Sequence, residues 1–252
     1  MPYINKVAGY YKKSYYKAAR GNEIGRALIN QFKSAVSAKE RPHSYEVLKR
    51  RLIKMLAGRF YWPSSWPTSL DPESGELLYG LVRLLKPEIV VEIGTFKGYG
   101  AICIGQALKD NKRGKLHTID PVELEIVNIG IRKAKLQEYV KYIVDYSTKA
   151  IPELKLEKID FAMIDGDHNY ESVKSDFETV RPLLRKGSVL MFHDTIWFDG
   201  PRRVIEEIKQ TGQFETLTLP TPVGIDENEA AVLCETNPQK ITPTGLSIVR
   251  KL

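Results

Sequence analysis

Short apolar runs alternate with helical segments from residue 89 to the end of the chain, and this rhythm constrains the fold more than any other feature. Ile-Val-Val-Glu-Ile at 89–93 is typical of a strand that is buried on both faces. The alternation predicts an α/β fold, a Rossmann-like doubly wound parallel sheet of about seven strands with helices on both faces. The predicted strands are 89–93, 115–119, 140–144, 159–164, 188–192, 214–219 and 246–250, and the predicted helices are 71–85, 101–108, 124–136, 147–154, 172–184 and 201–210.

Net charge is distributed unevenly along the chain. Residues 1–62 carry 14 Lys and Arg against 3 Asp and Glu, whereas the remaining 190 residues carry 24 against 28. Apolar residues recur at helical spacing in segments 3–37 and 44–57. We therefore expect a basic N-terminal helical extension over residues 1–70 and an α/β domain over residues 71–252.

The basic, tyrosine-rich residues 1–60 allow two interpretations. Lys and Arg interleaved with aromatic rings suit phosphate contacts and base stacking, so an anionic partner such as a nucleic acid, an acidic lipid surface or a phosphorylated substrate fits this segment. A solvated helical face would have the same composition.

Composition places the protein in the cytoplasm. No apolar run approaches the roughly 18 residues of a transmembrane helix, and the first residues lack the apolar stretch of a secretory signal. The two cysteines, Cys103 and Cys234, stand far apart in apolar runs and form no CxxC pair. They are expected to be buried, reduced thiols.

A glycine-rich turn follows the first predicted strand. Glu92, Gly94, Gly98 and Gly100 follow an E-x-G-x-x-x-G pattern just before a helix. Glycines let a ligand approach the backbone closely, and a helix N-terminus offers free N–H groups to a carboxylate. The spacing differs from the G-x-G-x-x-G of dinucleotide sites, and no P-loop sequence is present. The turn is a candidate cofactor site.

Polar residues also follow the second and third predicted strands. Asp120 could accept hydrogen bonds from both ribose hydroxyls of a nucleoside, or it could cap the next helix. Ser147, after Asp145 and Tyr146, could contact an adenine edge or serve as a helix N-cap. Both roles remain open for each residue.

The densest polar cluster follows the fourth and fifth predicted strands. Asp165, Asp167 and His168 come after the fourth, and His193 and Asp194 after the fifth. The carboxyl ends of parallel strands meet at one edge of the sheet, where ligands of such folds bind. These side chains predict a functional site at that edge.

Together these motifs resemble the class I S-adenosylmethionine-dependent O-methyltransferases. The turn at 92–100 is similar to motif I of catechol and caffeoyl-coenzyme A O-methyltransferases. Ile-Asp-Gly-Asp-His-Asn-Tyr at 164–170, His-Asp-Thr at 193–195 and Gly-Leu-Ser-Ile-Val-Arg at 245–250 resemble the macrocin O-methyltransferase-like group. The resemblance covers about 180 residues and identifies 71–252 as the S-adenosylmethionine-binding domain.

The resemblance assigns a role to each matching residue. Asp120 would bind the ribose, Ser147 the adenine, and Asp165 would lie beside the sulfonium or ligate a metal. The residues that would form the cofactor turn are Glu92, Gly94, Thr95, Gly98, Tyr99 and Gly100.

The expected reaction is methyl transfer to a hydroxyl group of a small molecule. A hydroxyl with a pKa near 10 needs help to lose its proton, and His168 is the candidate base. In the metal-dependent relatives a divalent ion does this instead, and here Asp165, His193 and Asp194 would hold magnesium or manganese. Histidine at position 193 replaces an acid, which makes magnesium less suited to the site.

Several alternatives stay open. Trp62, Trp66 and Trp197 could line the acceptor pocket or pack in the core. The basic residues 1–60 are compatible with an RNA-binding protein or an RNA methyltransferase, and cephalosporin hydroxylase-like proteins share the motif at 165–170. The extra N-terminal helices could cover the pocket or mediate a homodimer, which is the assembly expected by analogy.

Overall fold

The computed structural model describes residues 70, 72–220, 224–225 and 242–252. The expected N-terminal extension, its helices, Trp62, Trp66 and Cys234 lie outside these residues, so the division of the chain at residue 70 stays a prediction. None of the described helices is long and apolar enough to span a membrane.

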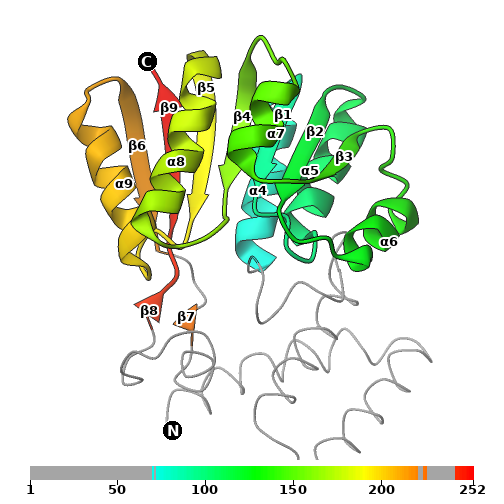
Figure 1. The fold of residues 1–252 in the computed structure, drawn as a ribbon, viewed down its shortest axis with the longest axis horizontal. Helices are drawn as coiled ribbons and strands as arrows, with labels where there is room; N and C mark the ends of the chain where they lie inside the picture. Colours follow the sequence, from blue (N-terminus) through cyan, green and yellow to red (C-terminus); the bar gives the residue numbers. More distant parts are fainter. Residues whose placement is uncertain (1–69, 71, 221–223, 226–241) are drawn as a thin grey trace, which may run out of the picture. The chain divides into compact units, whose positions relative to one another are not determined.

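The described residues form one seven-stranded sheet in the order β3-β2-β1-β4-β5-β9-β6, flanked by helices on both faces (Figure 1). This confirms the predicted α/β fold and its seven strands. The strands are β1 (Ile89–Ile93), β2 (Lys115–Asp120), β3 (Val140–Val144), β4 (Ile159–Ile164), β5 (Leu184–His193), β6 (Phe214–Leu219) and β9 (Leu246–Lys251), and the short strands β7 (Gly224–Ile225) and β8 (Thr242–Pro243) pair separately.

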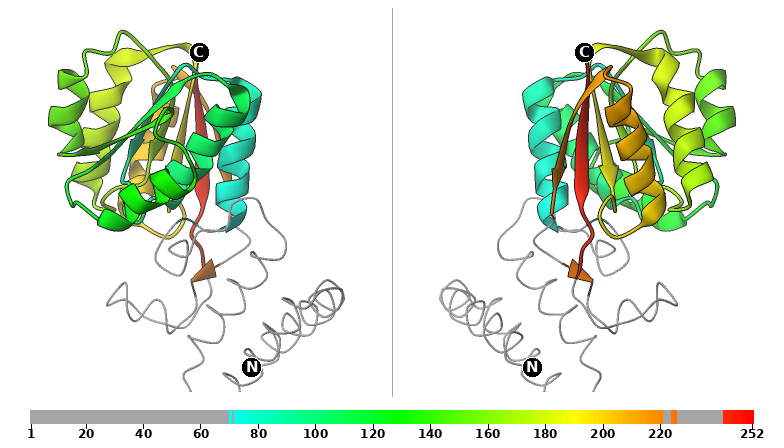
Figure 2. Two further views of the ribbon diagram at one scale, coloured as in Figure 1. Left: turned by 90° about the vertical axis from the view of Figure 1, so that its right-hand side faces the viewer. Right: turned by 90° about the vertical axis from the view of Figure 1, so that its left-hand side faces the viewer.

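The helices divide between the two faces of the sheet (Figure 2). On one face α4 packs against α5, and on the other α8 contacts both α7 and α9. The helices are α4 (Pro72–Leu85), α5 (Tyr99–Asn111), α6 (Glu125–Lys133), α7 (Ser147–Glu153), α8 (Tyr170–Val180) and α9 (Asp199–Gln210).

The sheet is mixed, which corrects the expectation of a wholly parallel one. Strands β3, β2, β1, β4 and β5 are parallel neighbours, but β9 runs antiparallel between β5 and β6. Leu246 at the start of β9 pairs with Leu219 at the end of β6, so β9 begins at the side of the sheet where β6 finishes. The chain thus re-enters the sheet at the edge where it left, and a strand that does so must run in the opposite direction.

The predicted helix over 172–184 was wrong at its end. The α-helix stops at Val180, a 3₁₀ turn covers Arg181–Leu183, and β5 already begins at Leu184. Pro182 contributes to the change, because it has no N–H to donate to the carbonyl four residues earlier.

The buried core lies between the sheet and its helices. Phe177 of α8 packs against Phe192 of β5 and Phe214 of β6, with ring centroids 6.2 and 5.9 Å apart. Cys103 of α5 is buried, as predicted. This packing fixes the strand ends on which the polar residues stand.

Candidate active site

The turn between β1 and α5 passes unusually close to the loop that follows β4. Gly94 has φ +93°, and a Cβ at this position would lie 2.1 Å from the backbone oxygen of Asp165. The N–H of Gly94 donates to the carbonyl of Ile119, at 2.9 Å. Gly98, at φ +83°, starts α5 in the left-handed conformation. At Gly94 only glycine combines this dihedral angle with such a close contact.

Glu92 is buried beneath this turn. Its side chain is 2% exposed, and the Thr118 hydroxyl donates to its Oε2 at 2.5 Å. Thr95 Oγ1 lies 2.5 Å from the same hydroxyl, and a Cβ at Gly100 would lie 2.1 Å from Glu92 Oε1. Burial raises the pKa of Glu92 to about 8, with the Thr118 hydrogen bond opposing the shift. This shift favours the neutral acid at pH 7.

Asp120 joins two turns at the carboxyl end of the sheet. Its Oδ2 accepts from the Phe96 N–H at 2.8 Å and its Oδ1 from the Val122 N–H at 2.9 Å. It does not cap α6, whose N-cap position is Leu124. The carboxylate faces the same cavity as the glycine turn.

Ser147 is the first residue of α7, and Tyr146 holds the N-cap position. The Ser147 hydroxyl donates to Oδ1 of Asp176 in α8, at 2.5 Å. Sequence reasoning missed Asp176. The available signal was an acid within the apolar stripe that Val173, Phe177 and Val180 form on this helix.

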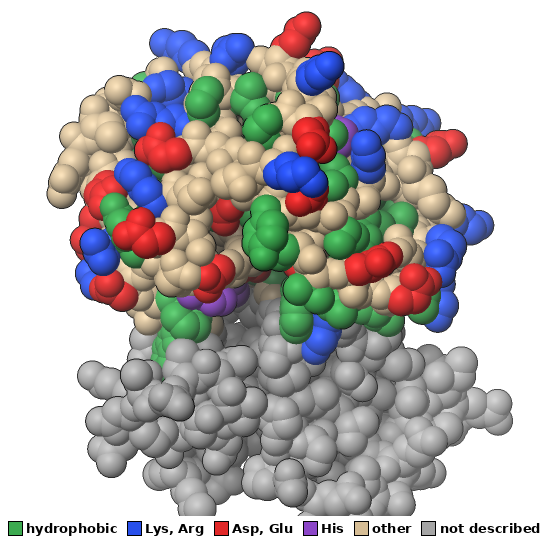
Figure 3. All heavy atoms as spheres, in the orientation of Figure 1, with side chains coloured by type: hydrophobic (Ala, Val, Ile, Leu, Met, Phe, Trp, Pro, Cys, Tyr) green, Lys and Arg blue, Asp and Glu red, His purple; other side chains and the backbone are tan. Residues whose placement is uncertain are grey.

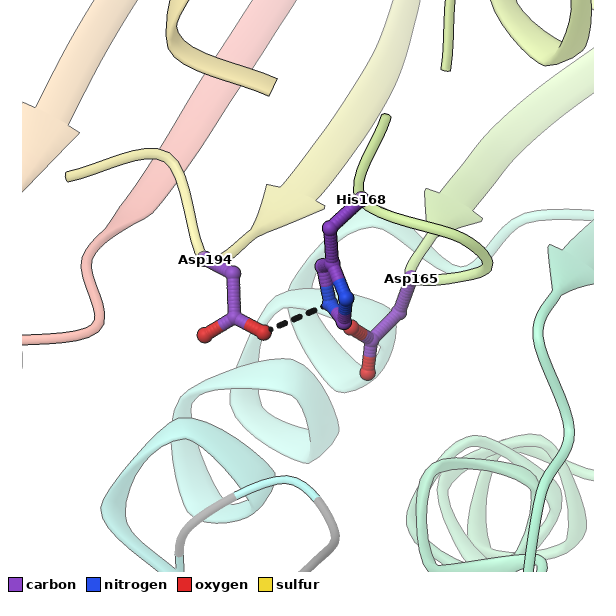
Figure 4. A group of neighbouring side chains, drawn as sticks. All are labelled: Asp165, His168 and Asp194. Atoms are coloured by element: carbon purple, nitrogen blue, oxygen red, sulfur yellow. Dashed lines mark ion pairs between the residues drawn. The ribbon is translucent and has the colours of Figure 1, made fainter. Parts of the chain in front are cut away.

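Two histidines and two aspartates meet where β4 and β5 end. Figure 4 shows three of them, Asp165, His168 and Asp194. His168 Nε2 lies 2.8 Å from Asp194 Oδ2, and the His168 ring stacks on Phe198 with centroids 4.1 Å apart. His193 Nδ1 lies 3.1 Å from Asp165 Oδ1 and 3.4 Å from Asp194 Oδ1. The loop after β4 and the end of β5 with its following loop thus place imidazole and carboxylate groups next to each other.

Mutual attraction shifts the pKa values in this cluster. Burial lowers the pKa of His193, but the charges of Asp194 and Asp165 outweigh it and hold the pKa well above the ordinary value. The same balance of burial against Asp194 raises the pKa of His168. Burial alone would raise the pKa of Asp194, yet the two histidines hold it far below its usual range.

A cavity of about 890 Å³ connects these groups. In the space-filling view, histidine atoms lie near acidic and apolar side chains at the lower edge of the described surface, where the parallel strands end (Figure 3). The site residues predicted from the sequence that line the cavity are Glu92, Gly94, Thr95, Gly100, Asp120, Ser147, Asp165, His168, His193 and Asp194.

Two other residues of the predicted cofactor turn, Gly98 and Tyr99, are not among the lining residues. Tyr99 is fully buried, and a Cβ on Gly75 of α4 would lie 2.7 Å from its ring. The aromatic ring that the loop after β5 contributes to the cavity is Phe198, not the neighbouring Trp197. The structure therefore brings together the strand-end residues but turns Tyr99 toward α4.

The sequence matches a family model and several known proteins. Residues 91–195 match a family model described as a methyltransferase domain. An uncharacterized protein of Sinorhizobium fredii is 33% identical over 172 residues, which cover 59% of this chain and 19% of that protein. A putative caffeoyl-CoA O-methyltransferase of Arabidopsis thaliana is 27% identical over 160 residues, covering 62% of this chain and 66% of that one.

The fold is that of solved O-methyltransferases. The O-methyltransferase of Bacillus cereus, crystallised with S-adenosylhomocysteine, superposes with a TM-score of 0.60 at 21% identity, covering 89% of this chain and 97% of the other. The chain spans less than two thirds of the length of the first curated relatives that it matches.

The close approach at Gly94 predicts a selective loss of stability. Gly187 in β5 has a similar φ of +88°, but a Cβ there would meet nothing within 4 Å. Gly187→Ala should therefore cost only the left-handed strain, roughly 1–2 kcal/mol. Gly94→Ala should cost about 1–3 kcal/mol more, because its methyl group overlaps the Asp165 carbonyl. Urea unfolding of both variants tests this, and equal losses would contradict the described contact.

Glu92 predicts a pH-dependent stability. The unfolded chain releases this proton near the ordinary value of 4.5 and the folded chain near 8, so raising the pH between them favours unfolding. The wild type should lose up to about 1.4 kcal/mol per pH unit relative to Glu92→Gln from pH 5 to 8. Chemical denaturation of both proteins across this range measures the difference. A difference that stays constant with pH would show that Glu92 is ionised in the folded protein.

Proposed function

We propose that this chain, which carries a class I O-methyltransferase domain, transfers the methyl group of S-adenosylmethionine to a hydroxyl oxygen of a small molecule. One observation carries the proposal: a single cavity is lined at one part by the glycine turn, Asp120 and Ser147, and at another by the His168–Asp194 pair. The S-adenosylhomocysteine held by the Bacillus cereus protein of the same fold supports the choice of cofactor.

The cavity offers a complementary group to each part of the cofactor. Asp120 uses each carboxylate oxygen for one backbone N–H, which leaves acceptor capacity for ribose hydroxyls. Ser147 stands at the start of α7 for the adenine, and the turn between β1 and α5, whose Gly94 and Gly100 line the cavity, would receive the methionine part. Glu92 and Asp165 supply carboxyl groups near the cationic centres.

S-adenosylmethionine supplies a methyl group on a cationic sulfur, so the protein must orient the acceptor and remove its proton. Asp194 holds His168 through Nε2, and the stacked Phe198 ring fixes the plane of the imidazole. This arrangement leaves Nδ1 as the basic nitrogen, as in other dyads in which a carboxylate orients a histidine. His168 Nδ1 would accept the hydroxyl proton as the acceptor oxygen bonds to the methyl carbon, the carbon–sulfur bond breaks, and S-adenosylhomocysteine leaves.

A divalent ion is the second candidate for lowering the pKa of the acceptor. Asp165, His168 and Asp194 each offer one ligand atom, and these atoms lie within 4.8 Å of one another. Two carboxylates and an imidazole suit manganese or a softer ion better than magnesium. His193, the third ligand suggested by the sequence, directs Nδ1 at both carboxylates, so it could complete the donor set.

The comparisons support methyl transfer and do not favour an RNA-binding protein or a hydroxylase-like protein. The acceptor is proposed only as a hydroxylated small molecule. A role of residues 1–60 in nucleic-acid binding, a homodimer and a cytoplasmic location stay predictions.

Cofactor binding is the first test of this proposal. Asp120→Ala should weaken S-adenosylhomocysteine at least about tenfold, because the ribose loses a charged acceptor. Asp160→Ala is a matched control, since Asp160 also accepts two backbone N–H groups but at the start of β1. Isothermal titration calorimetry of both variants and the wild type measures the dissociation constants for S-adenosylhomocysteine. Absence of binding to the wild type would overturn the proposal.

The role of His168 is tested by separating binding from turnover. His168→Ala should lower methyl transfer to the best acceptor in a panel of phenols and sugars by about 10²–10⁴-fold and leave S-adenosylhomocysteine affinity unchanged. His117→Ala, in β2 and outside the cavity, should retain activity. Wild-type activity that survives excess EDTA supports His168 as the base without a metal. Wild-type activity that EDTA abolishes and manganese restores supports the divalent ion. Full activity of His168→Ala would show that His168 is not the general base.

A further inference from the structure

Charge is polarised between the two edges of the large sheet. All of its strands except β9 begin at one edge, here called the amino edge, and the cavity lies at the other. The segments at the amino edge carry 15 Lys and Arg against 7 Asp and Glu, whereas the other described residues carry 8 against 16. Figure 3 shows several basic side chains along the upper edge, opposite the histidine atoms. The segments of the amino edge are 83–88, 109–115, 134–139, 153–160, 181–187, 209–215 and 250–252.

Contacts between these segments make the amino edge a continuous surface. Glu88, just before β1, pairs with Arg113 before β2 at 2.7 Å and with Lys158 before β4 at 2.8 Å. Farther along, Arg185 at the start of β5 donates to the carbonyl of Glu157 at 2.8 Å. The acid Glu88 is thus neutralised within the surface, and the excess of positive charge extends across the starts of β1, β2, β4 and β5.

Four lysines follow helix ends at this edge in the left-handed conformation. Lys86, Lys112, Lys135 and Lys155 come after α4, α5, α6 and α7, with φ between +49° and +55°. Glycine is the usual residue at such positions, because a side chain there is strained. The negative end of a helix dipole favours a cation, yet each lysine is exposed and no described residue pairs with its ammonium group. These charges are therefore available to an anionic partner.

Two leucines beside this charge face solvent. Leu84 and Leu85 form the end of α4, directly before Lys86, and are 77% and 41% exposed. Exposed apolar side chains next to lysines suit a surface that lies on an anionic bilayer, because the leucines enter the boundary of the acyl chains while the lysines contact headgroup phosphates. The amino edge thus has both an apolar anchor and a basic surround.

A nucleic acid fits this edge less well than a lipid surface. The aromatic rings in its segments are those of Tyr139 and Phe214. Phe214 is buried, with the Lys251 ammonium group 4.6 Å from its ring centroid, and the Lys115 ammonium group lies 5.8 Å from the centroid of Tyr139. Both rings are engaged within the protein, so they offer no open face on which a base could stack.

We propose that the amino edge is a docking surface for an anionic lipid bilayer, with its lysines on the headgroup phosphates and Leu84 and Leu85 in the interface. The cavity fixes the orientation of docking. Eight acidic residues line it, and none of its described lining residues is Lys or Arg, so the same bilayer repels that edge. Docking keeps the cavity away from the lipid, and the inference holds whatever reaction the cavity performs.

Co-sedimentation of the full chain with lipid vesicles tests the proposal. The wild type should bind vesicles with about one third phosphatidylserine at least about tenfold more tightly than phosphatidylcholine alone, and high salt should remove the difference. The triple variant Lys86→Gln, Lys112→Gln and Lys155→Gln should lose at least about tenfold in affinity. Leu84→Ser should lose about threefold or more, because less apolar surface enters the bilayer.

Control variants make the same changes elsewhere. Lys149→Gln, Arg202→Gln and Arg203→Gln together remove three charges near the starts of α7 and α9, at the other edge, and Leu217→Ser removes an exposed leucine of β6. Both controls should bind like the wild type. Equal losses in the two triple variants would overturn the proposal, as would wild-type binding that needs no anionic lipid. RNA that binds more tightly than the vesicles, and that the Lys86, Lys112 and Lys155 variant releases, would assign the edge to a nucleic acid instead.

Discussion

The close contact between the β1–α5 turn and the loop after β4 is the constraint on which the site depends. The Asp165 N–H donates to the Ile93 carbonyl at 2.9 Å, and the Gly94 N–H donates to the Ile119 carbonyl at 2.9 Å. These two bonds tie together the ends of β1, β2 and β4. Gly94 has no side chain to separate the backbones, so one cavity can reach all three strand ends.

Several acids that line this cavity are buried, and each has different neighbours. Burial raises the pKa of Glu92, two histidines lower the pKa of Asp194, and Asp176 accepts a hydrogen bond from Ser147. The environments of these carboxyl groups differ because they stand on different elements. The proposed function needs such separation, because one cavity would bind a cationic cofactor and also accept a proton.

Most of the fold and many of the residues that line the cavity could be predicted because their signals are local. The run at 89–93 is a strand whatever its neighbours are, and polar residues that follow apolar strands gather at one edge of a parallel sheet. Tyr99 shows the limit of this reasoning. It follows Gly98 in the turn, but the helical path of α5 directs its ring against Gly75, 24 positions earlier in the chain. Asp176 was missed because its partner Ser147 lies in another helix.

The sequence by itself determined the α/β alternation, the glycine turn and the positions of the polar strand ends, because each depends on residues near one another in the chain. Tertiary structure decided the antiparallel insertion of β9, the pairing of Ser147 with Asp176 and the placing of His168 against Asp194. These contacts join residues 26 or more positions apart, and no local propensity encodes which distant side chain will meet another. They arise only when the packed helices and strands bring the ends of the sheet together.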